Sequence, residues 1–263
     1  MLLEMIFSDT SHTNADVTVS LVSHGHGQML ADILGDLAGI PQVAKIILTL
    51  NVPEPLPAIP ANLDQKLTVM SNSIPKGFGA NHNAAFARCD TPFFCVLNPD
   101  IRLQMNPFPS LLAALALRDS ALAAPLVVNS KGAVEDSLRH FPTIFSLAKK
   151  VLGVDDGRYC YPPGSDSFPV DWVGGMFMLF ESSFYRRLNG FDEGFFLYYE
   201  DVDICVRLWT AGGIVLACPG AVVIHDARRT SHRRVRYLLW HIHSMMRYFA
   251  KHWMRLPKTS KVP

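Results

Sequence analysis

Residues 190–203 read GFDEGFFLYYEDVD, and the other motifs of the chain are interpreted around them. A run of large aromatic side chains leads into three carboxylates, Glu200, Asp201 and Asp203. An apolar helical pattern then runs to Gly212, and acids suit the first turn of a helix because its free N–H groups favour negative charge. Acids packed against aromatic rings also lose hydration, which raises a carboxyl pKa and improves the group as a proton acceptor. The stretch therefore predicts a helix start, and three acids together indicate a catalytic rim.

The composition is that of one globular domain. The chain has 263 residues, of which 49% are hydrophobic, and a mean hydropathy of +0.17, enough for one large α/β core. The long apolar window at 111–128 carries Arg118 and Asp119, so it does not read as a membrane span. Residues 1–17 lack a basic segment, so no signal peptide is expected and a cytoplasmic location follows. The five cysteines form no C-x-x-C pair, which argues against a disulfide framework or a zinc site.

Residues 231–263 form a strongly basic tail. After Asp203 the only acid is Asp226, whereas arginines and lysines accumulate toward the end. Residues 232–255 combine this charge with tryptophans and aliphatic side chains at helical spacing. Such a helix lies on an anionic membrane surface, or it caps the core with its apolar face and presents its arginines to water. Both interpretations stay open on the sequence.

The N-terminal part reads as a strand–helix–strand unit of a parallel sheet. β-branched and apolar residues fill 17–23 and 44–50, with a helical pattern at 28–37 between them. The crossover of such a unit is right-handed, and ligands bind beyond the carboxyl ends of its strands. These ends predict a ligand crevice at Ser23–His24 and Asn51. The other predicted elements are a helix at 111–118 and short strands at 124–128, 214–217 and 221–224.

Two further strands lead into polar turns. Residues 67–70 form a short strand before a turn with Gly77 and Gly79, whose lack of a side chain allows the backbone to approach a ligand closely. A plain helix entry explains these glycines as well. Residues 93–97 form a buried strand that ends in Asn98–Asp100. A carboxylate at that tip could bind the cation of a diphosphate, although Asn-Pro-Asp is also good turn chemistry.

Four later positions are candidates for ligand contacts. Arg139 suits a phosphate or a sugar, but a surface salt bridge is the commoner role of an arginine. Trp172 suits stacking on a sugar as well as a place in the core, and Gly174–Gly175 allows close approach beneath a ligand. His225 follows a predicted strand, where a histidine is either a structural hydrogen-bonding group or a ligand.

Taken in order, these motifs resemble the inverting glycosyltransferases of family 2, which have the GT-A fold. The resemblance extends from about residue 17 to residue 253. It is greatest to the bacterial rhamnosyltransferases that use dTDP-L-rhamnose in cell-surface polysaccharide assembly. Each motif is modest alone, but the ordered set is specific. The set consists of the turn from Asn72 to Asn83, Leu97–Asp100, Trp172–Gly175, the block from Gly190 to Gly212, and His225.

The resemblance implies a role for the charged positions. Asp201 is the general base, with Glu200 as the other member of the family's acidic pair. Asp100 binds Mg²⁺ or Mn²⁺ on the donor diphosphate. Asn98 replaces the first acid of the family's D-x-D motif, which leaves more of the metal binding to Asp100 and His225.

The residues expected to bind the nucleotide of the donor depart from the family pattern at one position. The second strand usually ends in an acid that helps to hold the nucleobase, but Leu50 stands there, and Glu54 is the candidate substitute. The remaining substrate contacts implied by the resemblance are Ser23, His24, Asn51, Gly77, Gly79, Asn83, Asn98, Arg139, Trp172, Gly174, Gly175 and Asp203.

The predicted fold class is α/β: a GT-A domain with a Rossmann-like, mostly parallel mixed sheet flanked by helices. It is expected to span residues 1–230, with a nucleotide-binding half at about 17–128 and an acceptor-binding half at about 129–230, followed by the basic amphipathic helix and tail at 231–263.

The implied function is transfer of L-rhamnose from dTDP-L-rhamnose to a hydroxyl of a growing or polyprenyl-diphosphate-linked polysaccharide of the O-antigen type. The enzyme would work peripherally at the inner face of the plasma membrane, on an anionic surface. The alternatives are the same fold with a UDP-sugar donor, and a non-catalytic module that binds nucleotide sugars. Nucleic-acid binding is disfavoured because no nucleic-acid-binding fold accompanies the arginine-rich tail.

Overall fold

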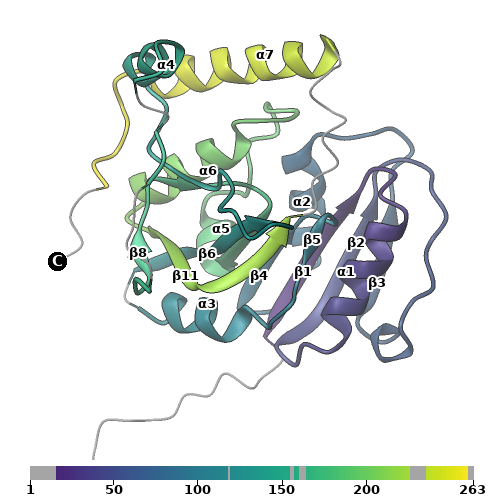
Figure 1. Cartoon of the computed structure of the whole chain (residues 1–263). Helices are drawn as coiled ribbons and strands as arrows, with labels where there is room; N and C mark the ends of the chain where they lie inside the picture. Colours follow the sequence, from purple (N-terminus) through teal and green to yellow (C-terminus); the bar gives the residue numbers. More distant parts are fainter. Residues whose placement is uncertain (1–15, 118, 155–156, 160–163, 226–234, 260–263) are drawn as a thin grey trace, which may run out of the picture.

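The computed structural model describes residues 16–117, 119–154, 157–159, 164–225 and 235–259. A large mixed sheet has helices on both faces (Figure 1), with strand order β3-β2-β1-β4-β10-β6-β11-β5 and β8 paired to β11. The strands are β1 Val17–Ser23, β2 Val43–Leu50, β3 Leu67–Ser71, β4 Phe93–Leu97, β5 Ile101–Arg102, β6 Ser120–Asn129, β7 Leu138–Arg139, β8 Phe168–Pro169, β9 Trp172–Val173, β10 Phe177–Glu181 and β11 Ile214–His225. The helices are α1 Gln28–Ala38, α2 Phe78–Phe86, α3 Phe108–Leu115, α4 Ile144–Val151, α5 Ser182–Arg187, α6 Glu200–Thr210 and α7 Val235–His252, with a 3₁₀ turn at Ala61–Leu63.

The N-terminal strands confirm the predicted parallel unit. β1 pairs in parallel with β2 and with β4, and β2 pairs in parallel with β3. Their carboxyl ends therefore meet at one edge of the sheet, where the backbone N–H of Asn51 donates to the carbonyl of Ser23 at 2.8 Å. This edge is the crevice that the sequence predicts.

The C-terminal strands bring two distant site residues together. β10 lies antiparallel between β4 and β6, and β11 runs parallel to β6. The last residues of β11 pair with the short β5, which places His225 opposite Ile101, the residue after Asp100. The register of β5 thus brings the tip of β4 to the tip of β11.

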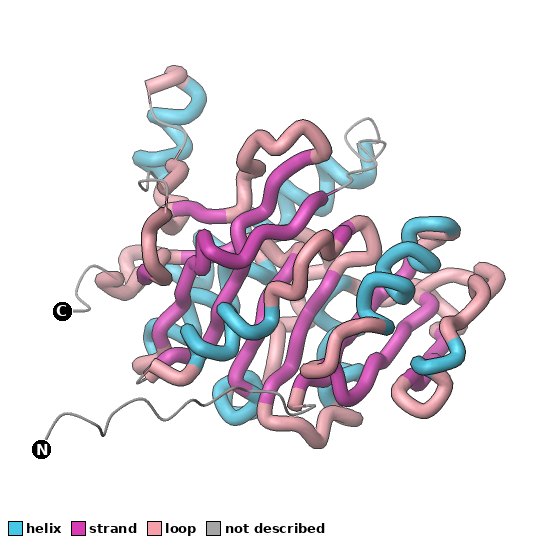
Figure 2. The backbone as a smooth tube through the Cα atoms, turned by 60° about the horizontal axis from the view of Figure 1, so that its bottom comes forward, coloured by secondary structure: helices cyan, strands magenta, loops and turns pink. Residues whose placement is uncertain are grey.

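Helices lie on both sides of the sheet (Figure 2). One hydrophobic cluster packs against each face. The cluster under α1 and α3 is mostly aliphatic, whereas the one under α2, α5 and α6 is rich in aromatic rings. Phe191 and Phe195 from the 190–203 stretch are buried in the second cluster, and Tyr185 packs its ring between Phe94 and Phe191. Part of the aromatic run therefore serves the core.

Four predicted elements differ from the structure. The strand expected at 124–128 is β6, which begins at Ser120. The two strands expected at 214–217 and 221–224 form the single strand β11, whose pairing with β6 shifts register between Cys218 and Val222. Pro219 and Gly220 fall in this irregularity, where a proline can be accommodated within a sheet. The helix expected at 111–118 starts at Phe108, because Pro109 is tolerated in a first helical turn.

The basic C-terminal helix is α7, within the predicted range 232–255, of which residues 232–234 lie outside the described part. None of the helices in the described ranges combines the length and apolarity needed to cross a bilayer. The division of the chain near residue 230 stays a prediction.

Candidate active site

Asp100 and His225 lie together, as expected, and a third residue joins them. The Nε2 atom of His225 is 3.2 Å from Asp100 Oδ2, and its Nδ1 atom is 2.5 Å from Glu135 Oε2. Glu135 is held in place because its backbone N–H donates to the carbonyl of Val127 in β6. The imidazole therefore bridges two carboxylates from two other parts of the chain.

Neighbouring charges and burial determine the protonation state of His225. Burial lowers the pKa of His225, but the hydrogen bonds and charges of Asp100 and Glu135 outweigh it and raise the pKa to about 9. The ring is thus cationic at neutral pH and can donate from both nitrogens. Asp100 Oδ1 is buried and has no hydrogen-bond partner among the described residues. A buried carboxylate oxygen without a hydrogen-bond partner lowers the stability of the fold unless a ligand binds to it.

Asp201 stands at the start of α6 with its carboxylate fixed by two backbone groups. Its Oδ2 accepts from the N–H of Gly175 at 3.1 Å, and its Oδ1 accepts from the N–H of Val202 at 2.9 Å. A Cβ at position 175 would lie 3.1 Å from the Phe78 ring and 3.7 Å from Cβ of Asp201. The absence of a side chain at Gly175 therefore avoids a tight contact with the Phe78 ring, whereas the distance to Asp201 would be an ordinary van der Waals contact.

The two acids of the pair differ in environment. Burial raises the pKa of Asp201, and the hydrogen bonds from Gly175 and Val202 only partly offset this effect. Burial, followed by the charges of Asp201 and Asp203, raises the pKa of Glu200 well above its usual range. Glu200 is buried, and its Oε2 has no hydrogen-bond partner within the described ranges. The geometry favours Asp201 as the anion of the pair, because its oxygens accept two backbone N–H groups.

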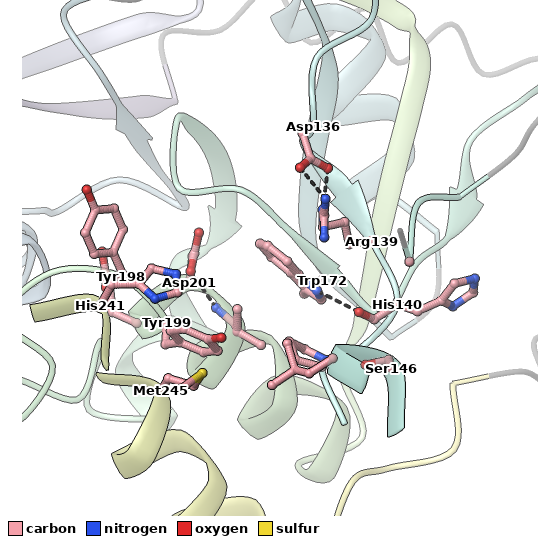
Figure 3. A pocket seen from close by; sticks show the side chains of 15 residues that line it. Asp136, Arg139, His140, Ser146, Trp172, Tyr198, Tyr199, Asp201, His241 and Met245 are labelled. Atoms are coloured by element: carbon pink, nitrogen blue, oxygen red, sulfur yellow. Dashed lines mark hydrogen bonds and ion pairs between the residues drawn. The ribbon is translucent and has the colours of Figure 1, made fainter. Parts of the chain in front are cut away.

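A pocket of about 300 Å³ opens beside Asp201. Tyr198, Tyr199 and Trp172 surround the carboxylate, and His241 and Met245 of α7 form part of the wall (Figure 3). The other lining residues are Asp136, Arg139, His140, Pro142, Ser146, Leu147, Gly157, Glu200 and Val202. Tyr198 and Tyr199 have φ values of 71° and 66°, a left-handed conformation that costs energy for residues with bulky side chains. This strain aims consecutive tyrosines at the pocket.

Asp100 is not among the residues that line this pocket, but two short links join it to Asp201. Glu135, which contacts His225, is followed directly by the lining residue Asp136. The N–H of Asn98 donates to the carbonyl of Met176 at 2.9 Å, and Met176 follows Gly175. The predicted metal-binding residue Asp100 and the predicted base Asp201 therefore lie on neighbouring segments.

Hydrogen bonds around Asn51 connect the segments at the predicted ligand crevice, where β1 and β2 end. Its amide nitrogen donates to the carbonyl of Lys76 and also lies 3.3 Å from His24 Nδ1. Ser23 is buried, whereas His24 is exposed. Glu54 lies here too, with Oε1 accepting from the N–H of Gly25 at 3.0 Å and Oε2 buried without a hydrogen-bond partner in the described residues.

Several predicted substrate contacts belong to the scaffold instead. A Cβ on Gly77 would lie 2.7 Å from the carbonyl oxygen of Phe196, and one on Gly79 would lie 2.6 Å from Cβ of Phe191. These glycines allow α2 to pack on the 190–203 stretch, so the close approach is to the protein itself.

Asn83 and Asp203 are also used internally. Asn83 accepts from the N–H of Phe191 at 2.9 Å and donates to the carbonyl of the same residue. Asp203 is fully buried and pairs with Arg207, Lys251 and His252. The physical reason in each case is that a buried polar group needs partners, and here the chain supplies them.

Arg139 and Trp172 do reach the pocket. Arg139 forms a bidentate ion pair with Asp136, and the indole N–H of Trp172 donates to the carbonyl of His140 at 3.0 Å. Gly174 lies next to them, since its N–H donates to the carbonyl of Ser137. The two side chains keep a face toward the pocket while their polar atoms are held by the protein.

The sequence places the run 132–139 at the edge of the site but assigns no role to Glu135, and it does not predict the contributions of α4 and α7 to the pocket wall. Glu135 belongs to an acidic run that includes Asp136, and only the bridge between Val134 and Val128 shows which acid reaches His225. The tyrosines were visible as part of the aromatic run, but their backbone conformation was not.

No family model matches the chain. It is 28% identical over 246 residues to the rhamnosyltransferase WbbL of Escherichia coli, covering 89% of this chain and 93% of that protein. It is 31% identical over 175 residues to the N-acetylglucosaminyl-diphospho-decaprenol L-rhamnosyltransferase of Mycobacterium tuberculosis, covering 62% of this chain and 57% of that protein. A mannosyltransferase of Pyrobaculum calidifontis, solved with GDP-Man and Mn²⁺, superposes with a TM-score of 0.60 at 14% identity, over 94% of this chain and 66% of that one.

The sheet, the Asp201 pocket and these similarities define a glycosyltransferase with the GT-A fold. Within that class, the chain is similar to the rhamnosyltransferases, since its 28% identity to WbbL extends over 89% of its length. The assignment as an enzyme disfavours the alternative of a non-catalytic binding module.

Proposed function

We propose that the chain transfers L-rhamnose from dTDP-L-rhamnose to a hydroxyl of a lipid-linked polysaccharide precursor, with inversion at the anomeric carbon. The observation that carries the proposal is Asp201, fixed by Gly175 in an aromatic pocket on segments adjacent to Asp100 and His225. The named activities of the two rhamnosyltransferase relatives support the choice of sugar, and the decaprenol-linked acceptor of one supports a lipid-linked acceptor.

The residues present suit a single displacement. The acceptor hydroxyl attacks the anomeric carbon, a new C–O bond forms, and the bond from that carbon to the diphosphate oxygen breaks. The hydroxyl proton passes to the carboxylate of Asp201, whose raised pKa makes it a better proton acceptor than an ordinary aspartate. Trp172, Tyr198 and Tyr199 offer flat faces to the acceptor sugar.

A divalent cation, Mg²⁺ or Mn²⁺, fits the residues at the other end of the site. Asp100 has a buried carboxylate oxygen with no partner in the described chain. Its Oδ2 lies 3.2 Å from His225 Nε2, so these two atoms would hold one ion between them. No group of three or more potential ligands gathers to hold an ion alone in the described part, which suits an ion shared with a diphosphate. Such an ion would neutralise charge on the departing diphosphate.

Glu135 would position His225 for this ion. A histidine that binds a metal commonly donates its other ring N–H to a carboxylate, which fixes the tautomer and the ring orientation. Glu135 Oε2 is placed to accept from Nδ1, so Nε2 would bind the ion beside Asp100 once the ion replaces the Nε2 proton. Glu135 thus acts through His225 and does not itself contact the diphosphate.

Glu54 supports the proposed thymine or uracil nucleotide. Burial raises the pKa of Glu54, but hydrogen bonds from Ser23, Gly25 and Gly27 outweigh it and lower the pKa, so the group is an anion. Its Oε2 lacks a partner in the described residues and could accept the ring N–H of a pyrimidine base. Thymine and uracil share this donor, so a UDP-sugar remains the alternative donor.

The substitution Asp201→Asn tests the proposal directly. Asn keeps the shape and can still accept from Gly175, but it cannot take the proton, so the rate of transfer should fall by about 10²–10⁴-fold. The measurement is release of nucleoside diphosphate with purified enzyme, a donor panel and a lipid-linked acceptor. Nucleotide affinity should be unchanged. The matched control is Asp90→Asn, an exposed carboxylate. Full activity of the Asp201 variant would refute the assignment of the base.

A further inference from the structure

The exposed face of α7 is apolar, which is the reverse of an ordinary surface helix. Val235, Leu239, Ile242 and Met246 recur at intervals of four, three and four residues, so they share one face of the helix. Their side chains are between 40% and 73% exposed. In a globular protein, the apolar stripe of a surface helix normally faces the core.

The opposite face of α7 is the one docked on the protein. Its buried residues are Ser244, Tyr248 and His252, of which Ser244 donates to the carbonyl of Leu197 and His252 pairs with Asp203. Polar contacts therefore fix the helix, and the aliphatic side chains are left outside. Tyr248 and Phe249 join the aromatic cluster, so α7 does cap the core with one face, but the face toward water presents aliphatic side chains as well as arginines.

Helix α4 adds a second apolar area beside the first. Phe145 is 81% exposed, and Ile144, Leu152 and Val154 are exposed as well. Figure 1 shows α4 and α7 on the same side of the molecule, away from the sheet. The hydroxyl of Tyr248 in α7 donates to the carbonyl of Pro142, just before α4, at 3.3 Å.

Both helices also border the Asp201 pocket. α4 contributes Ser146 and Leu147 to its lining, and α7 contributes His241 and Met245. The two helices that carry the exposed apolar side chains therefore also form part of the wall of the Asp201 pocket. A position at the rim of a substrate pocket links this surface to the acceptor rather than to the donor.

The charge of the two helices distinguishes a bilayer from a second copy of the chain. Neither α4 nor α7 contains an acidic residue, and exposed cations accompany the apolar side chains, among them Lys149 and Arg236. Two copies meeting through this surface would bring like charges together, whereas anionic lipid would be attracted to it. An apolar stripe with flanking cations is the pattern of a helix that lies in a membrane interface.

We propose that the exposed apolar surface of α4 and α7 docks on an anionic lipid bilayer, so that the Asp201 pocket opens at the membrane. The inference rests on the proposed lipid-linked acceptor. It adds that two helices far apart in the sequence share the docking, and that the bilayer fixes the direction in which the pocket faces.

Vesicle binding by the full chain tests the proposal. We expect co-sedimentation with vesicles of phosphatidylcholine plus phosphatidylglycerol, and much less with phosphatidylcholine alone. Ile242→Glu on α7 and Phe145→Glu on α4 should each weaken binding by about tenfold or more, because affinity scales with the apolar area inserted. Both side chains are exposed, so the fold should be kept. The control is Leu117→Glu, an exposed apolar residue at the end of α3.

Activity with two acceptors separates this inference from the proposed function. The two glutamate variants should keep wild-type turnover with a water-soluble acceptor and lose transfer to an acceptor embedded in vesicles. The docking proposal is wrong if the wild-type protein does not bind anionic vesicles, or if both variants bind them as well as the wild type does. Neither result would contradict the proposed enzymatic function. If the wild-type protein is a dimer and both variants are monomers, the surface binds a second copy of the chain, and the proposal of membrane docking is wrong. No turnover with any donor or acceptor, together with intact vesicle binding, would count against the proposed function alone.

Discussion

At the scale of single residues, the site depends on carboxylates whose partners determine their roles. Asp201 accepts two backbone N–H groups and lies in the pocket, whereas Asp203, two positions later, is fully buried in an ion-pair cluster. Glu200, directly before Asp201, is buried with one oxygen unpaired in the described chain. Three acids that look alike in the sequence therefore have three different environments.

Glu135 gives a prediction that does not depend on turnover. Glu135→Gln keeps the size of the side chain but removes the charge that holds the Nδ1 proton of His225. We expect the affinity for Mn²⁺, in the presence of nucleoside diphosphate, to fall by about 10–100-fold, the usual effect of losing a partner of a metal-binding histidine. Electron paramagnetic resonance of free Mn²⁺ measures this affinity.

A second readout separates positioning from a general loss of structure. The ¹⁵N chemical shifts of the His225 ring, followed against pH, should report a lower pKa in the Glu135→Gln variant, because the charge of Glu135 raises this pKa. An unrelated destabilisation would not produce this change. The control is Asp64→Asn, an exposed carboxylate. Unchanged Mn²⁺ affinity in the Glu135 variant would remove this residue from the account.

At the scale of elements, α7 is fixed to α6 by buried charge. Asp203 of α6 accepts from His252 at 2.7 Å and lies 2.7 Å from Lys251 Nζ, and Arg207 pairs with it from within α6. Burial raises the pKa of Asp203, but the hydrogen bond of His252 and the charges of Arg207 and Lys251 outweigh it and lower the pKa. The helix that forms one wall of the pocket is thus held by ionised Asp203, together with Asp192, which pairs with Arg247 and Lys251.

The substitution Asp203→Asn should therefore be strongly destabilising. It removes the buried charge that Arg207, Lys251 and His252 share. Breaking a fully buried pair costs about 3–5 kcal/mol of unfolding free energy, and we expect a loss near the lower end because the side chains of Arg207 and Lys251 are 19% and 31% exposed. Urea unfolding at pH 7 measures the difference, with Asp64→Asn as an exposed control. The pKa of Asp203 in the folded state lies below the ordinary value of 3.8. The extra stability of the wild type over the Asp203→Asn variant is therefore full above pH 3.8 and is lost as the pH falls through the folded-state pKa. A wild-type advantage that did not shrink in acid would contradict this account.

At the scale of the whole molecule, ligand binding should stabilise the fold by mass action. A ligand at 100 times its dissociation constant adds about 2.7 kcal/mol to the unfolding free energy. We expect dTDP with Mn²⁺ to raise the thermal midpoint more than UDP with Mn²⁺, and either nucleotide without metal to raise it less. A larger shift with UDP would favour the UDP-sugar alternative. Glu54→Gln should reduce both shifts, since thymine and uracil share the ring N–H that Glu54 is proposed to accept.

The local pattern of the sequence determined the strands that build the sheet. β1 at 17–23 and β4 at 93–97 have the predicted bounds, because a buried strand requires a short apolar run with a polar stop. Strand ends in turn determined where the crevice would lie, since parallel strands bring their carboxyl ends to one edge. The motif order was enough to indicate the GT-A class.

Only the tertiary structure decided which polar residues face the site. Gly79 and Asn83 look like ligand-binding residues in the sequence, yet they hold the 190–203 stretch against α2. Glu135 has no local signal that distinguishes it from Asp136, because its role depends on the register of a bridge to β6. Which face of α7 is buried was equally undetermined, since polar contacts such as the one from His252 to Asp203 form only after distant elements pack. Local patterns specify elements, whereas the role of a side chain is set by partners that the fold brings from elsewhere.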